Sequence, residues 1–267
     1  MSSYDPHGGA RGLAGEIDRL EAQAALSWPL EFEHMAALGL RDGMAVLELG
    51  CGPGCITARL RRALPNSPIT AVDHDASLLA HAARRLGNGV EFVHASAYRT
   101  GFADGRFDWV LSRYLYQHLD DADAAVREAY RVLRAGGRHV VIDIDDGLWG
   151  IIDPVPPGFR GVTAMQADPL PCGGSDRHIG RKLWRLLAEA GYADVKLQLF
   201  AYHSDALGRE AFLPQLHPER ALAARGSAPL KVGDIGLLHA NYQAFKSAES
   251  AFVMFVGFLA SGCRNGG

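Results

Sequence analysis

Short, almost entirely apolar segments alternate with segments of helical periodicity between residues 44 and 144. A strand reads as a continuous apolar run when both faces of its sheet are covered, and helices between successive strands supply that cover. The alternation therefore predicts a doubly wound, Rossmann-like α/β fold with a largely parallel sheet. The expected strands are residues 44–49, 68–72, 90–94, 107–112 and 139–144, and the expected helices are residues 56–64, 76–86 and 121–133.

The alternation starts only after an N-terminal segment with its own pattern. Apolar residues recur at helical spacing before residue 40, so residues 1–40 are expected to form a helical cap of two helices. Pro29 is expected to separate the two helices, because proline removes a backbone donor and disrupts a helix interior. Residues 41–202 are then expected to form the Rossmann-like domain.

The regular pattern lapses after residue 146, in a stretch rich in proline and glycine. It returns as an expected helix over residues 177–190 and an expected strand over residues 195–202. Residues 203–249 are too long for a hairpin loop and are expected to be a helical insertion that acts as a substrate lid. Residues 250–267 are expected to supply the last strand of the sheet.

Composition argues against several classes of function. The formal net charge is −3, and the 27 basic and 30 acidic residues are scattered, so no clustered basic surface points to nucleic acid. The longest apolar stretch, residues 251–260, is about half of what a membrane-spanning helix needs. The polar start of the sequence lacks a secretory signal, so a soluble cytoplasmic protein is expected. The four cysteines show no zinc-site spacing, and no metal is expected.

A glycine-rich turn follows the first expected strand. Gly50, Gly52 and Gly54 leave the backbone uncovered by side chains, which a loop needs in order to approach a ligand closely. Cys55 stands where a dinucleotide-binding loop has its last glycine, so the spacing disfavours a nicotinamide cofactor. The turn by itself is also compatible with a simple change of chain direction.

A carboxylate ends the second expected strand at Asp73, 23 positions after Gly50. At this edge of a doubly wound sheet it can accept hydrogen bonds from both hydroxyls of a ribose. The alternative is a solvated turn aspartate.

Five segments in order resemble the successive motifs of the class I S-adenosylmethionine-dependent methyltransferases. The chain is similar to the small-molecule branch of the ubiquinone-biosynthesis type. The resemblance implies S-adenosylmethionine as cofactor and S-adenosylhomocysteine as product. It also implies a seven-stranded sheet of order 3-2-1-4-5-7-6 with the seventh strand antiparallel. The segments are Leu47 to Gly54, Ala71 to Asp73, Val90 to Ala97, Phe102 to Val110 and Val132 to Gly137.

The resemblance also implies a set of cofactor contacts. The glycine turn borders the methionine part, Asp73 holds the ribose, and the residues after Asp73 flank the adenine. The family usually has an aspartate at the position of Ser96, whose hydroxyl can still accept one hydrogen bond. The implied cofactor-binding residues are Gly50, Cys51, Gly52, Asp73, His74, Leu78, Ser96, Ala97 and Arg113.

The acceptor is expected over the carboxyl ends of the fourth and fifth strands. Related enzymes often have two histidines after the fourth strand, whereas this chain has Gln117 and His118. The candidate general bases are therefore His118, for which a structural role is the alternative, and the carboxylates Asp143 and Asp145 at the end of the fifth strand. Asp143 is favoured because it aligns with a carboxylate that related enzymes place beside the acceptor. Asp146 is expected to be solvated. The expected acceptor-binding residues are Tyr114, Gln117, Asp145 and Trp149.

These expectations combine into an enzyme that methylates a small molecule in secondary or cofactor metabolism by in-line transfer. A protein of this fold that binds the cofactor but catalyses another step, such as a cyclisation, is the alternative. A nicotinamide oxidoreductase is disfavoured by the glycine spacing together with Ser96 and Ala97. The small-molecule acceptor is the expected partner, and a homodimer is left open.

Overall fold

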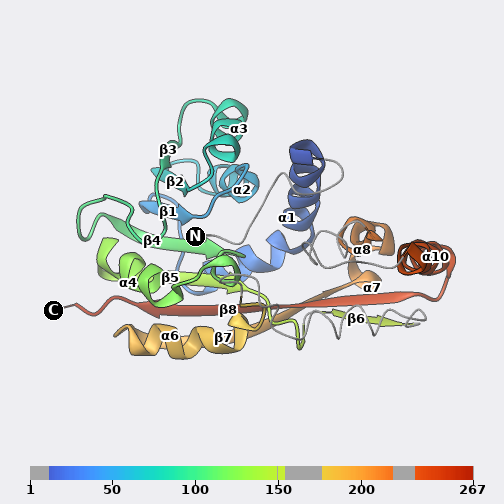
Figure 1. Cartoon of the computed structure of the whole chain (residues 1–267). Coiled ribbons are helices and arrows are strands. Elements are labelled where there is room, and N and C mark those ends of the chain that lie inside the picture. Colours follow the sequence, from blue (N-terminus) through green and yellow to red (C-terminus); the bar gives the residue numbers. More distant parts are fainter. Residues whose placement is uncertain (1–11, 149, 154–175, 219–231, 267) are drawn as a thin grey trace.

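The computed structural model describes residues 12–148, 150–153, 176–218 and 232–266. Within these ranges one sheet runs in the order β3-β2-β1-β4-β5-β8-β6, and β7 pairs with the other edge of β8 (Figure 1). The strands are β1 (Val46–Leu49), β2 (Ile69–Asp73), β3 (Glu91–His94), β4 (Phe107–Arg113), β5 (Leu133–Asp143), β6 (Gly150–Asp153), β7 (Ala193–His203) and β8 (Phe252–Cys263).

The strand order that the family resemblance implies is confirmed, with one additional short strand. The first five strands pair in parallel, and β8 is antiparallel to β5 and to β7, which makes β7 and β8 the sixth and seventh strands of the expected plan. The four-residue β6 was not expected. It forms because β8 is longer than its pairing with β5, which covers only residues 258–263, so the first part of β8 leaves an edge that β6 occupies.

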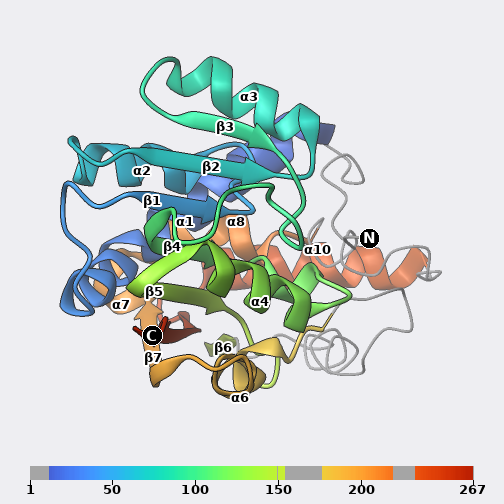
Figure 2. The same ribbon diagram turned by 90° about the vertical axis from the view of Figure 1, so that its left-hand side faces the viewer.

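Helices cover both faces of the sheet, and Figure 2 shows α1 and α4 on opposite sides of it. The inward sides of α1 and α2 pack on one face, and those of α4 and α6 pack on the other. The strands between them are buried on both faces, which explains their continuous apolar sequences. The longer helices are α1 (Gly12–Ala37), α2 (Cys55–Ala63), α3 (Ala76–Leu86), α4 (Ala122–Val132), α6 (Leu183–Glu189) and α10 (Val232–Ser247).

The N-terminal helix runs through Pro29, where the sequence predicts a break. That prediction is wrong, because α1 is one helix that changes direction along its length in Figure 1. Proline removes one backbone hydrogen bond and typically kinks a helix. Here Ser27 and Glu31 on either side of the proline are both held by Arg113 of β4, which keeps the two halves of the helix on the sheet.

Short helices follow β7 in the segment that was expected to be an insertion. Phe212 and Leu213 are buried there, and Phe212 packs against Tyr202 of β7 and Phe255 of β8. This part of the chain thus contributes to the core beside the end of the sheet; its role as a substrate lid stays a prediction. The short helices are α7 (Ser204–Leu207), η3 (Arg209–Phe212) and α8 (Leu213–Leu216). None of the helices in the described ranges is long and apolar enough to cross a membrane.

A neutral histidine is buried between the sheet and α4. His139 has no solvent-exposed surface, and its ring nitrogens lie 3.2 Å from the Ser112 hydroxyl and 3.1 Å from the Tyr192 hydroxyl. The Tyr192 hydroxyl donates to the carbonyl of Val126, so it accepts from Nδ1 of His139, and Nε2 accepts from Ser112. Burial lowers the pKa of His139 to about 3.

We expect His139 to make the fold sensitive to acid. Its pKa is lower in the folded chain than the ordinary 6.5, so the unfolded chain binds the extra proton and the free energy of unfolding falls as the pH drops below 6.5. The variant His139→Gln keeps a donor and an acceptor but takes up no proton. Urea unfolding at pH 7 and pH 5 should show that the parent loses about 2 kcal/mol more than the variant. Equal losses in the two proteins would contradict a neutral buried His139.

Candidate active site

The glycine turn between β1 and α2 is hydrogen-bonded to the end of β2. Gly50 and Gly52 have positive φ angles of 75° and 53°, which the absence of a Cβ atom makes accessible. A Cβ atom on Gly50 would lie 2.9 Å from a methyl carbon of Leu115, so this position also needs glycine for space. The amides of Gly50 and Cys51 both donate to the carbonyl of Val72. The turn is therefore held in place before any ligand binds.

Asp73 closes the same turn from the side of β2. Its carboxylate is buried and accepts hydrogen bonds from the amide of Gly52 at 2.7 Å and from the amide of Asp75 at 2.9 Å. The half-exposed ring of His74 lies beside it, and the hydrogen bond to Asp73 raises the pKa of His74. Leu78 is buried on α3. The structure thus brings Asp73 and His74 to the rim of the glycine turn.

The loop after β3 carries the two residues that were expected beside the adenine. Ser96 accepts a hydrogen bond from the amide of Tyr98, and Ala97 is partly buried. The Tyr98 hydroxyl donates to the carboxylate of Asp120 and accepts from the amide of the same residue. Tyr98 therefore ties this loop to the start of α4.

Arg113 at the end of β4 forms a buried ion pair with α1. Its Nε lies 2.8 Å from one carboxylate oxygen of Glu31 and 3.0 Å from the other, and its Nη2 lies 2.9 Å from the Ser27 hydroxyl. Glu31 and Ser27 are fully buried. The guanidinium also stacks 4.2 Å over the ring of Tyr114. The resemblance implies that Arg113 lies beside the methionine part of the cofactor. In the structure its guanidinium is bound by Glu31 and Ser27 of the N-terminal helix.

Glu48 is a buried carboxyl that was not among the expected site residues. It is 2% exposed, and the Thr57 hydroxyl donates to it at 2.6 Å. Burial raises its pKa to about 8, a rise that Arg113 opposes and Asp73 increases. The signal that predicts such a site is a glutamate inside the otherwise apolar strand β1, two residues before the first glycine of the turn.

Tyr114 follows β4 in a strained backbone conformation. Its φ angle is 52°, which is uncommon for a residue with a side chain, and its amide donates to the carbonyl of Ile142. Its hydroxyl is buried, and its polar neighbour is the hydroxyl of Tyr202 on β7. A buried polar group on a residue with such a backbone conformation is a common feature of binding sites.

The short helix η1 (Tyr116–His118) lies at the end of β4 and is tied to β5. The amide of Gln117 donates to the Asp143 carboxyl at 3.2 Å, and the Gln117 side chain accepts from Arg177 at 2.7 Å. The pKa of His118 is lowered to about 3 by burial and by the positive charges of Arg177 and Arg19. His118 is therefore neutral at physiological pH.

Asp143 ends β5 without any exposed surface. Besides Gln117, the amide of Ile144 donates to it at 2.8 Å, and burial raises its pKa to about 7 in spite of these hydrogen bonds. The structure thus brings Asp143 and Gln117 into contact. Trp149, the remaining expected acceptor-binding residue of this loop, lies outside the described residues.

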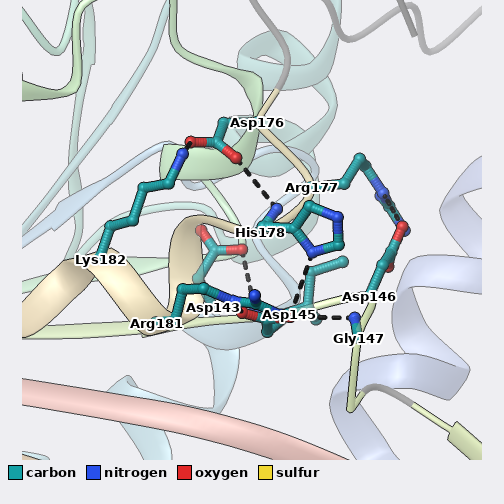
Figure 3. A network of polar contacts seen from close by, with 10 residues as sticks. Asp143, Asp145, Asp146, Gly147, Asp176, Arg177, His178, Arg181 and Lys182 are labelled. Carbon is teal, nitrogen blue, oxygen red and sulfur yellow. Dashed lines mark hydrogen bonds and ion pairs between the residues drawn. The ribbon is translucent and has the colours of Figure 1, made fainter. Parts of the chain in front are cut away.

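Figure 3 shows the polar network that continues from the end of β5. Asp145 is fully buried and accepts from Arg181 at 2.6 Å and from His178 at 3.2 Å. Burial acts to raise the pKa of Asp145, but these hydrogen bonds outweigh it and lower the pKa to about 2. Asp146 is paired with Arg177 at 2.8 Å and is 5% exposed, so the expectation that it is solvated is wrong. No sequence pattern indicates that Arg177 and Arg181, more than thirty positions away, neutralise these carboxylates.

Comparison with known proteins identifies the family. A family model described as a methyltransferase domain matches residues 46–137. The ubiquinone/menaquinone biosynthesis C-methyltransferase UbiE of Desulfotalea psychrophila is 32% identical over 202 residues, which cover 70% of this chain and 82% of that protein. The chain belongs to the class I S-adenosylmethionine-dependent methyltransferases. It is of the ubiquinone-biosynthesis type, and S-adenosylmethionine is its cofactor.

Solved structures agree with this fold. Phosphoethanolamine N-methyltransferase 2 of Haemonchus contortus, in complex with phosphomonomethylethanolamine and S-adenosylhomocysteine, superposes with a TM-score of 0.57 at 16% identity, over 92% of this chain and 56% of that chain. The [4+2]-cyclase SpnF superposes with a TM-score of 0.54 at 21% identity, over 99% of this chain and 87% of that chain. Likeness at this level shows the fold alone, because proteins that share one fold can catalyse different reactions.

The residues at the glycine turn fit a cofactor of this kind. Nothing lies within 4 Å of the place where a Cβ atom on Gly52 would stand, Asp73 offers a carboxylate at the rim, and the buried carboxyl of Glu48 suits a ligand that carries positive charge. No group of three or more metal-ligating side chains was found among the described residues.

We expect the Glu31–Arg113 pair to be essential for stability. The variant Glu31→Ala leaves a buried guanidinium without a carboxylate, which typically costs about 3–5 kcal/mol in the free energy of unfolding. The matched control is Glu189→Ala, because Glu189 pairs with Arg185 on the surface of α6, where both side chains are 55% exposed. Urea unfolding should show a loss of at most about 0.5 kcal/mol for the control. Similar losses in both variants would contradict a special role for the buried pair.

Proposed function

We propose that this methyltransferase methylates a small-molecule acceptor, bound where the carboxyl ends of β4 and β5 meet, in secondary or cofactor metabolism. The observation that carries the proposal is the buried hydroxyl of Tyr114 at this edge, on a residue with an uncommon φ angle that lies near Asp143 and beside the short helix η1. A small polar group of an acceptor would form a hydrogen bond with that hydroxyl. The UbiE relative, named for quinone biosynthesis, supports an acceptor of small size.

A labelled-methyl assay tests the proposal. The enzyme is incubated with methyl-labelled S-adenosylmethionine and with host extract separated into a small-molecule fraction and a macromolecular fraction. We expect label to enter the small-molecule fraction. Label that enters only protein or nucleic acid would overturn the proposal, and cofactor binding without any transfer would favour a non-methylating reaction on this fold.

The cofactor is proposed to lie along the glycine turn. Its methionine part would border Gly50, Cys51 and Gly52, and its ribose hydroxyls would donate to Asp73, which already lies at the rim of the turn. The adenine would lie between the two loops that follow β2 and β3. The residues proposed there are His74, Leu78, Ser96 and Ala97.

Removing the Asp73 carboxylate should weaken cofactor binding. The variant Asp73→Ala loses two charge-assisted hydrogen bonds to the ribose, and we expect a loss of at least about 2 kcal/mol, or thirtyfold in affinity. Isothermal titration calorimetry with S-adenosylhomocysteine measures this change. The control is Asp75→Asn, because asparagine caps a helix as well as aspartate does and Asp75 caps α3. Unchanged affinity in folded Asp73→Ala would show that the ribose lies elsewhere.

Methyl transfer from a sulfonium is an in-line displacement, to which holding the two reactants together contributes most. The protein's own part is to position the acceptor and to take a proton where the acceptor still carries one. A base works best when its pKa lies near the operating pH. Asp143, with a pKa of about 7, meets this condition, whereas His118, with a pKa of about 3, is a weak base. We therefore assign proton removal to Asp143 and acceptor contact to Tyr114 and Gln117.

Two other residues of the site take supporting roles in this proposal. Asp145 is saturated by Arg181, His178 and the amide of Gly147, so it holds the loop after β5 in place for the acceptor. Arg113 holds α1 against the same edge and stacks on Tyr114.

Replacing Asp143 should reduce turnover. In Asp143→Asn the amide oxygen can still accept from a backbone amide but takes no proton, so we expect kcat to fall at least about a hundredfold while cofactor affinity is kept. The parent should lose activity as the pH falls below about 7, because the base is then protonated, and this acid limb should be absent from the residual activity of the variant. Turnover within about threefold of the parent would leave proximity alone to carry the reaction.

A further inference from the structure

Two buried carboxyl groups, those of Glu31 and Glu48, lie near the guanidinium of Arg113. Glu31 is fully buried and takes the Nε–H of Arg113 on both of its oxygens, together with the Ser27 hydroxyl. Glu48 is 2% exposed and receives a hydrogen bond from the Thr57 hydroxyl of α2. Arg113 is therefore the counter-ion of Glu31.

The other groups that face Glu48 do not compensate a negative charge. Asp73 of β2 is itself a carboxylate, and its charge disfavours ionisation of Glu48. The buried thiol of Cys51 in the turn has a pKa raised well above its ordinary value, so it stays neutral. Arg113 of β4 is the favourable neighbour, but it is already held by Glu31 of α1. A buried carboxylate without its own counter-ion is costly, and the group keeps its proton instead.

We infer that Glu48 is neutral in the free protein and ionises when the cationic cofactor binds at the glycine turn, so that cofactor binding releases a proton. The O–H bond of the Glu48 carboxyl breaks, the proton passes to the buffer, and no electrons are transferred. The sulfonium and ammonium groups of S-adenosylmethionine then supply the positive charge that the site lacks. The inference rests on the proposed position of the cofactor at this turn.

Proton release makes affinity depend on pH. Below pH 8 the free protein must give up a proton in order to bind, so affinity for S-adenosylmethionine should rise by up to about tenfold between pH 6 and pH 7. Glu48→Gln presents a neutral group at every pH and should lack this rise. Both proteins meet the same ligand, so the difference between them excludes titration of the cofactor itself.

Isothermal titration calorimetry tests the inference directly. Binding heats of S-adenosylmethionine at pH 7 are measured in two buffers with different ionisation enthalpies, and their difference gives the number of protons released. We expect about one proton for the parent and close to none for Glu48→Gln. Asp143→Asn is the matched control, because Asp143 is the other buried carboxyl with a raised pKa, and it should still release the proton.

Two results would overturn the inference. The first is binding heat without proton release in the parent, which would leave the methyltransferase assignment intact. The second is unchanged release in Glu48→Gln. If Glu48→Gln does not fold, Thr57→Val provides a second test. The valine removes the hydroxyl whose hydrogen bond favours the ionised Glu48 carboxyl. The pH above which release stops should then move upward, and an unchanged pH would contradict the role of Glu48.

Discussion

The buried ion pair between Glu31 and Arg113 is the interaction on which the arrangement of the site depends. It joins the N-terminal helix to the end of β4, across a bend at Pro29 that would otherwise weaken the helix. A fully buried carboxylate is tolerated only when a cation and hydrogen bonds satisfy it, and Arg113 and Ser27 do so here. The pair therefore places α1 over the same sheet edge that carries Tyr114.

The carboxyl groups of the site differ because their neighbours differ. Asp145 meets Arg181 and His178, and its pKa is lowered. Asp143 and Glu48 meet mainly backbone amides or a hydroxyl, and burial raises their pKa values into the neutral range. Pairs of similar groups with opposite shifts allow one fold to combine fixed charges with groups that exchange protons. The proposed division of roles follows: Asp145 holds the loop, and Asp143 and Glu48 are the groups that exchange protons.

Much of the fold could be predicted from the sequence. The alternation of apolar strands with helices predicted a doubly wound, largely parallel sheet, and the resemblance to the methyltransferase family supplied the strand order. The placement of Asp73 beside the turn follows from the same connectivity, since β1 and β2 end at the same edge. Local propensity favours a break at Pro29, but long-range contacts, among them those of Ser27 and Glu31 with Arg113, keep the helix continuous.

The sequence by itself determined the sheet, the turn and the family, because periodicity and short motifs are local properties of the chain. Only the tertiary structure decided which charges meet. Arg177 and Arg181 reach Asp146 and Asp145, and Arg113 reaches Glu31 across 82 positions of sequence. No local sequence pattern encodes these pairs. Burial and neighbouring charges shift the pKa values of the carboxyl groups in the site, so its protonation chemistry exists only once the chain has folded.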